Sequence, residues 1–120
     1  MPAIDSAARD RSCIEHMLSY CMQLDASLDE INRSRESFLS STTYQNAVAM
    51  CILQLGELTK TLSSTFIKTH NQSPSNLIAK TRDIYAHHYG SVDTEMLWNT
   101  AVYDIPALRA FCETYLNSCF

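Results

Sequence analysis

One stripe of apolar residues in the first quarter of the chain limits the fold more than any other feature. Its members recur at steps of three and four residues, with Met17 beside them: Ile14, Leu18, Cys21, Leu24 or Asp25, Leu28 and Ile31. This spacing places them on one face of an α-helix. Asp5 or Ser6 can cap the first turn of that helix. The sequence therefore predicts a helix of about seven turns, whose apolar face other helices must cover.

The rest of the chain has the same helical character. Apolar spacing predicts further helices from Thr42 or Thr43 to Leu62, from Ser73 or Ser75 to about His88, and from Asp93 or Thr94 onward. The last helix is expected to restart at Asp104 as a cap, with Pro106 in the new first turn. The stretches 34–43 and 69–75 are expected to be connections, and the first has room for one short helical turn.

Turn residues are scarce, which narrows the fold class. Two glycines and three prolines among 120 residues are too few for a β-sandwich or a doubly wound sheet. We therefore expect an all-α fold, an up-and-down bundle of four to five helices, in one domain over residues 1–120.

Charge and cysteine content restrict the classes of function. The net charge of −4 argues against a protein that grips nucleic acid with its whole surface. However, residues 58–82 carry four basic side chains and no acidic one, so a local basic face is expected. The five cysteines are scattered, which favours reduced thiols and predicts neither a metal nor another cofactor. The absence of a signal-like or bilayer-length apolar run predicts a cytoplasmic protein without a membrane segment.

Titratable side chains concentrate between Arg82 and Gly90. On a regular helix, Arg82 and Tyr89 lie within about 20° of one face, and His87 lies about 140° from Arg82. Because His87 sits at the helix end before Gly90, the backbone there can turn it towards the arginine. An imidazole can take the proton of a ribose 2′-OH, and a guanidinium can hold a phosphate oxygen. The segment is thus a candidate site for metal-free RNA cleavage.

Three further landmarks accompany this segment. They are Tyr44-x2-Ala47-Val48, the Gly56-Glu57 pair inside the second predicted helix, and Leu97-Trp98 followed by Asp104-Ile105-Pro106-x-Leu108. With Arg82-x4-His87-x-Tyr89, they resemble in order and spacing the HepT-like proteins of the HEPN superfamily, whose motif is R-x4-H-x-Y. The similarity covers nearly the whole chain. It departs from the family at Asp83, where many relatives have Asn, and at Ser75, where relatives often have Trp.

The resemblance implies a function. HepT-like proteins are usually toxins of two-gene toxin–antitoxin modules, and form homodimers in which both motifs meet in one cleft. The implied activity is metal-independent endoribonuclease cleavage, with Arg82 and His87 as catalytic residues. The implied antitoxin is a small MNT-type nucleotidyltransferase that transfers AMP from ATP to Tyr89.

Three other residues are expected to support the site. Asp83 can orient the histidine or the arginine, although its charge lies beside an anionic substrate. His88 can assist or replace His87. Glu57 is expected to act as a partner of Arg82, on the family pattern and because no other acidic residue lies between Asn46 and Arg82.

Two alternatives to a nuclease are left open by the sequence. In the first, the chain is a non-catalytic interaction module, and Tyr89 is the residue that the nucleotidyltransferase modifies. In the second, the chain forms a helical dimer without chemistry, in which Arg82 and His87 only cap and pack.

Overall fold

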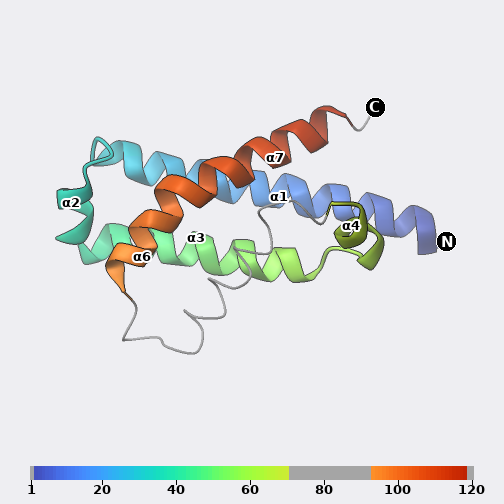
Figure 1. The fold of residues 1–120 in the computed structure, drawn as a ribbon, viewed down its shortest axis with the longest axis horizontal. Coiled ribbons are helices and arrows are strands. Elements are labelled where there is room, and N and C mark those ends of the chain that lie inside the picture. Colours follow the sequence, from blue (N-terminus) through green and yellow to red (C-terminus); the bar gives the residue numbers. More distant parts are fainter. Residues whose placement is uncertain (1, 71–92, 119–120) are drawn as a thin grey trace.

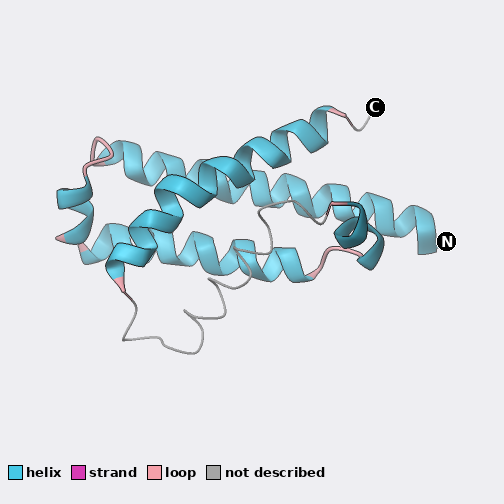
Figure 2. Ribbon diagram, in the orientation of Figure 1, coloured by secondary structure: helices cyan, strands magenta, loops and turns pink. Residues whose placement is uncertain are grey.

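The computed structural model describes the backbone of residues 2–70 and 93–118, and every element in these ranges is helical (Figure 2). The elements are α1 (Pro2–Glu30), α2 (Arg35–Leu39), α3 (Thr42–Lys60), α4 (Ser64–Thr69), α6 (Thr94–Asn99), the π-helical turn η1 (Thr100–Asp104) and α7 (Ile105–Asn117). This confirms the prediction of an all-α fold. The third predicted helix and Gly90 lie outside the described residues.

The long helices pack side by side. Figure 1 shows α1 and α3 running in opposite directions, with α7 lying across them, and α1 contacts both α3 and α7. The short helices α2 and α4 lie at opposite ends of this bundle. None of the described helices is both long enough and apolar enough to cross a lipid bilayer.

The apolar stripe of α1 forms the centre of the core. Its fully buried members are Ile14, Met17, Cys21, Leu24 and Leu28. Leu24 rather than Asp25 therefore occupies the core position that the sequence left open. The Asp25 side chain is 13 % exposed and accepts a hydrogen bond of 2.6 Å from Arg109, which ties α1 to α7.

Serine side chains define the starts of α2 and α3. The Ser34 hydroxyl accepts the Ser37 N–H and begins α2, the short helix for which the sequence left room. The Ser41 hydroxyl accepts the Tyr44 N–H and caps α3, so the prediction of Thr42 or Thr43 as the cap was one or two residues late. The predicted start of the first helix was also late, because α1 already begins at Pro2, where a missing N–H is harmless.

The predicted end of the second helix at Leu62 was wrong, and α4 was not predicted. The reason is a long-range contact between α1 and the chain after α3. The buried Asp10 carboxylate accepts the Ser63 N–H at 2.9 Å and the Ser63 hydroxyl at 2.6 Å. Ser63 takes an extended conformation, and its hydroxyl also accepts the Phe66 N–H, which starts α4. Asp10 thus ends one helix and positions the next.

Replacing Asp10 with alanine is expected to lower the free energy of unfolding by about 1.5–3 kcal/mol, because it leaves Ser63 without a charged hydrogen-bond acceptor. Urea unfolding followed by circular dichroism measures this. Asp29→Ala is the matched control, because Asp29 is exposed and pairs on the surface with Arg33, where such pairs contribute about 0–1 kcal/mol. Equal losses for the two variants would contradict the assigned role of Asp10.

The last helix starts as predicted, and Pro106 lies in the first turn of α7 as predicted, but Asp104 does not cap that helix. The Asp93 carboxylate accepts the Glu95 N–H at 2.9 Å and caps α6. Asp104 has helical backbone angles and makes no capping hydrogen bond, and burial raises the pKa of its carboxyl. Pro106 lacks an N–H, and its ring crowds the carbonyl four residues earlier. The wider π-helical turn η1 before Pro106 accommodates the ring, so the chain passes from α6 to α7 without a break.

Candidate functional site

Most of the predicted site residues lie outside the described part of the chain. These are Arg82, Asp83, His87, His88 and Tyr89. The described residues on either side belong to α4, which ends at Thr69, and to α6, which Asp93 caps. Ser75, the second departure from the family pattern, also lies outside.

Glu57 is the predicted site residue that the structure describes. It lies in the last turn of α3, and its side chain is exposed. Its neighbour Gly56 is buried, so Gly56 faces the core and Glu57 faces the solvent. The position of Glu57 on the surface permits a contact with a substrate or with the motif, and its role beside Arg82 stays a prediction.

The other sequence landmarks are structural. Val48, Gly56, Leu97, Trp98, Ile105 and Leu108 are all buried, and Tyr44 packs against the core. Their spacing therefore reflects the packing of the core, in which α3 contacts α6 and α1 contacts α7. The buried ones carry no titratable group.

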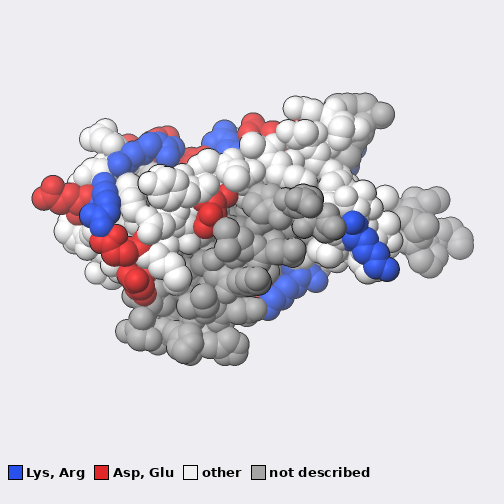
Figure 3. All heavy atoms as spheres, viewed as in Figure 1, with Lys and Arg blue, Asp and Glu red and all other residues white. Residues whose placement is uncertain are grey.

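Charged side chains are distributed unevenly along the bundle. On the face drawn in Figure 3, basic side chains lie around α4 and the end of α3, whereas acidic ones gather towards α2 and α6, where basic side chains lie among them. Lys60 and Lys68 carry two of the four positive charges of the predicted basic stretch, and both are exposed. The other two, Lys80 and Arg82, lie outside the described residues. The charge pattern suits an anionic ligand near the α4 end.

The two described histidines differ in their surroundings. His16 is exposed, and its Nδ1 lies 2.8 Å from the Ser12 carbonyl oxygen. His70 is partly buried, stacks on Phe66 with ring centroids 4.3 Å apart and meets Phe111 edge to face. This aromatic cluster holds α4 against α7. Sequence reasoning missed it because it did not foresee α4, although Phe66 and His70 are four residues apart.

The described cysteines are structural thiols. Cys13, Cys21, Cys51 and Cys112 are buried and free, which confirms the prediction of reduced thiols for these four. Burial raises the pKa of Cys112 to about 12 and raises that of Cys21 well above its ordinary value. Because the thiolate is the reactive form, these groups are poor nucleophiles at neutral pH.

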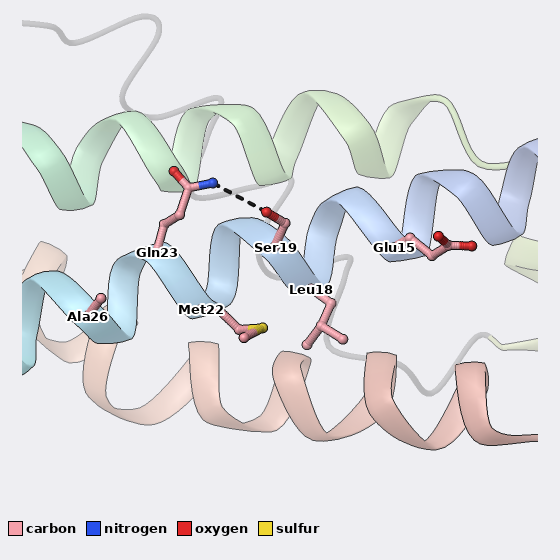
Figure 4. A pocket seen from close by; sticks show the side chains of 6 residues that line it. All are labelled: Glu15, Leu18, Ser19, Met22, Gln23 and Ala26. Carbon is pink, nitrogen blue, oxygen red and sulfur yellow. Dashed lines mark hydrogen bonds between the residues drawn. The ribbon is translucent and has the colours of Figure 1, made fainter.

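A shallow hollow on α1 offers little for catalysis. Figure 4 shows Leu18 and Met22 pointing to one side of α1, and Gln23 to another side, where its amide donates to the Ser19 hydroxyl at 3.3 Å. Among the lining residues that the structure describes, Glu15 is the one charged side chain. A described lining with a carboxylate and no cation does not suit a phosphate-bearing substrate.

Comparison with known proteins gives a consistent result. The model of the family described as Ribonuclease HepT-like matches residues 13–115, a range that contains Glu57 and the whole segment 82–89. No solved structure is significantly similar to this chain.

Several curated relatives bear ribonuclease names. The chain is 35% identical over 74 residues to "Probable ribonuclease HepT" of Thermococcus cleftensis, which covers 62% of this chain and 67% of that protein. It is 31% identical over 99 residues to a protein named "Putative RNase" from Caldanaerobacter subterraneus subsp. tengcongensis, covering 82% of this chain and 87% of the relative. The fold and these matches agree, and the chain belongs to the HepT-like ribonuclease family of the HEPN superfamily.

Proposed function

We propose that the protein is an endoribonuclease that cleaves RNA without a metal ion, through Arg82 and His87. The observation that carries the proposal is the spacing Arg82-x4-His87-x-Tyr89 within the matched range 13–115. The exposed basic side chains near α4 and the end of α3 support it, because they favour an anionic substrate.

The proposed reaction is a transesterification at one phosphodiester. His87 takes the proton of the ribose 2′-OH, and the 2′-oxygen attacks the adjacent phosphorus. Arg82 binds a non-bridging oxygen and stabilises the charge that develops on the phosphorane. The bond to the 5′-oxygen breaks, and that oxygen takes up a proton. The products are a 2′,3′-cyclic phosphate and a 5′-hydroxyl. Asp83, His88 and Glu57 are proposed to orient or assist these two residues.

The biological role that we propose is that of a toxin in a toxin–antitoxin module. Two copies of the helical domain form a homodimer, which brings both motif segments into one cleft. The partner is an MNT-type nucleotidyltransferase. The Tyr89 oxygen attacks the α-phosphorus of ATP, pyrophosphate leaves, and the phenol proton is released. The added AMP then blocks the cleft and repels an RNA phosphate.

Induced expression in a bacterial host tests the toxin role. Wild type is expected to arrest growth and to fragment cellular RNA, whereas His87→Ala at the same protein level leaves both unchanged. Co-expression of the nucleotidyltransferase is expected to restore growth with wild type. If wild type and His87→Ala are equally harmless without the partner, the interpretation as a helical dimer without chemistry is favoured instead.

The alternative interaction-module hypothesis shares one step with the toxin hypothesis, the modification of Tyr89. Incubation with the nucleotidyltransferase and ATP labelled at the α-phosphate is expected to label wild type, and Tyr89→Phe should lose the label because it lacks the accepting hydroxyl. Label on Tyr89→Phe equal to that on wild type would eliminate Tyr89 as the target. Labelling without any RNA cleavage by the unmodified protein would favour the interaction module over the nuclease.

A further inference from the structure

A second hollow, of about 310 Å³, lies between α1 and the end of α3. Arg9, Ser12, Cys13 and His16 of α1 line it, together with Leu58 and Thr61 from the other side. Arg9, Ser12 and His16 are three and four residues apart, so they share one face of α1. The described residues of its lining include no acidic side chain, and its volume is at the lower end of the range for small-ligand sites.

Two hydrogen-bond donors in this hollow are available. The Arg9 guanidinium makes one long hydrogen bond, 3.5 Å to the Ser6 hydroxyl, and pairs with no carboxylate among the side chains that the structure describes, which begin at Ser6. The Ser12 hydroxyl has no side-chain hydrogen bond in the described part of the chain. The nearby Asp10 carboxylate has both oxygens directed to Ser63, whose N–H and hydroxyl donate to them at 2.9 and 2.6 Å. Its negative charge still acts on the hollow, since it helps burial to raise the pKa of Cys13. A guanidinium and a hydroxyl on one face suit a phosphate oxygen pair.

The histidine supplies an acceptor. Nδ1 of His16 lies 2.8 Å from the Ser12 carbonyl oxygen, which can only accept, so Nδ1 carries the proton of the neutral ring. Nε2 then presents a lone pair. An acceptor beside a phosphate site can bind the 2′-OH of a ribose, the group that distinguishes RNA from DNA.

The other polar groups of the hollow form its wall. The Cys13 thiol and the Thr61 hydroxyl both donate to the Leu58 carbonyl oxygen, at 3.0 and 2.7 Å. The Thr61 bond satisfies a carbonyl at the C-terminal end of α3, and the Cys13 bond joins this end to α1. The donors and acceptors that remain for a ligand therefore belong to Arg9, Ser12 and His16.

We propose that this hollow binds one nucleotide of single-stranded RNA outside the cleavage segment, with the phosphate on Arg9 and Ser12 and the ribose 2′-OH on His16. The inference rests on the proposed ribonuclease function and adds a binding step to it. Glu57 lies one helical turn before Thr61, about 6 Å along α3, so the hollow is close to the surface where the site is expected. A contact of this kind would hold the strand while a neighbouring phosphodiester is cut.

Binding measurements on the uncleaving His87→Ala background test the proposal. Fluorescently labelled single-stranded RNA and DNA of one sequence are titrated at several salt concentrations. Arg9→Gln is expected to weaken binding of both strands by about three- to tenfold, and to reduce the slope of log K against log salt by about 0.7, the value for one phosphate contact on a single strand. His16→Phe is expected to abolish the preference for RNA while leaving DNA binding unchanged.

Arg11→Gln is the matched control. Arg11 lies on the same helix, is exposed, and pairs with Glu15 at 3.5 Å, so its replacement changes the net charge equally without touching the hollow. Equal affinities and salt slopes for Arg9→Gln and Arg11→Gln overturn the proposal, as does an unchanged RNA preference in His16→Phe or the absence of RNA binding. If the protein with His87 intact fails to cleave RNA but its RNA binding depends on Arg9 as expected, the binding hollow is supported and the nuclease function is contradicted. If the protein cleaves RNA and Arg9→Gln binds RNA as Arg11→Gln does, the nuclease function is supported and the binding hollow is contradicted.

Discussion

Replacing His87 with alanine is expected to slow RNA cleavage by about 10²–10⁴-fold, the usual contribution of a general base. Without the imidazole, only water can take the 2′-OH proton, so the loss should fall on the cleavage step more than on RNA binding. Single-turnover cleavage at saturating protein measures that step directly. The RNA dissociation constant of the variant should stay within about twofold of the wild-type value.

His88→Ala is the control that the chain itself offers. It removes an adjacent imidazole and leaves the spacing of the motif intact. If His87 is the base, His88→Ala should cleave within about tenfold of wild type. A larger loss for His88→Ala than for His87→Ala would transfer the catalytic role to His88. Circular dichroism of both variants checks that the helical content is unchanged.

Replacing Phe38 with alanine is expected to lower the free energy of unfolding by about 3–5 kcal/mol. Phe38 is fully buried, and its ring lies 5.4 Å from that of Trp98. It is the one buried residue of the five-residue helix α2 and joins it to α6, which an ion pair between Arg35 and Glu95 also connects. The cavity would therefore loosen this end of the bundle, and domains of this size have only about 5–15 kcal/mol of stability in total. Urea unfolding gives the difference.

Met50→Ala provides the comparison for an exposed apolar side chain. Met50 is 55% exposed on α3, so truncating it should change the free energy of unfolding by no more than about 0.5 kcal/mol. A loss below about 1 kcal/mol for Phe38→Ala would show that α2 contributes little to the core and would contradict the packing described above.

The helices were predictable wherever local spacing decides the structure. Ile14, Cys21, Leu24 and Leu28 of the stripe are buried as expected, with Leu18 partly buried, and Asp93 caps α6 as expected. Each of these features depends on residues within a few positions of one another. Periodicity and capping chemistry therefore suffice to identify them.

The predictions of helix ends were wrong where contacts between residues far apart in the sequence determine the structure. The end of α3 depends on the Asp10–Ser63 hydrogen bonds, which join residues 53 positions apart. The π-helical turn before Pro106 allows the helix to continue past the proline into α7. The sequence pattern did not predict this turn. Capping rules predicted that Asp104 begins a new helix, whereas in the structure α6, η1 and α7 follow one another without a break.

The functional residues also fall into those recognisable from neighbouring positions and those brought together by long-range contacts. The motif from Arg82 to Tyr89 is recognisable because its chemistry lies within eight consecutive residues. The hollow lined by Arg9 and His16 could not be recognised from the sequence, because its second wall comes from Leu58 and Thr61 in another part of the chain. The His70 cluster was missed for the same reason, since Phe111 belongs to α7.

Analysis of the ends of the RNA products tests the central claim most directly. Purified protein is incubated with an end-labelled RNA in excess EDTA, and the fragments are characterised by mass spectrometry. Attack by the 2′-oxygen predicts 2′,3′-cyclic phosphate and 5′-hydroxyl ends, no cleavage where the RNA carries a single 2′-deoxy substitution, and loss of these products with His87→Ala. Cleavage that requires added metal, or that persists unchanged in His87→Ala, would contradict metal-free cleavage by Arg82 and His87.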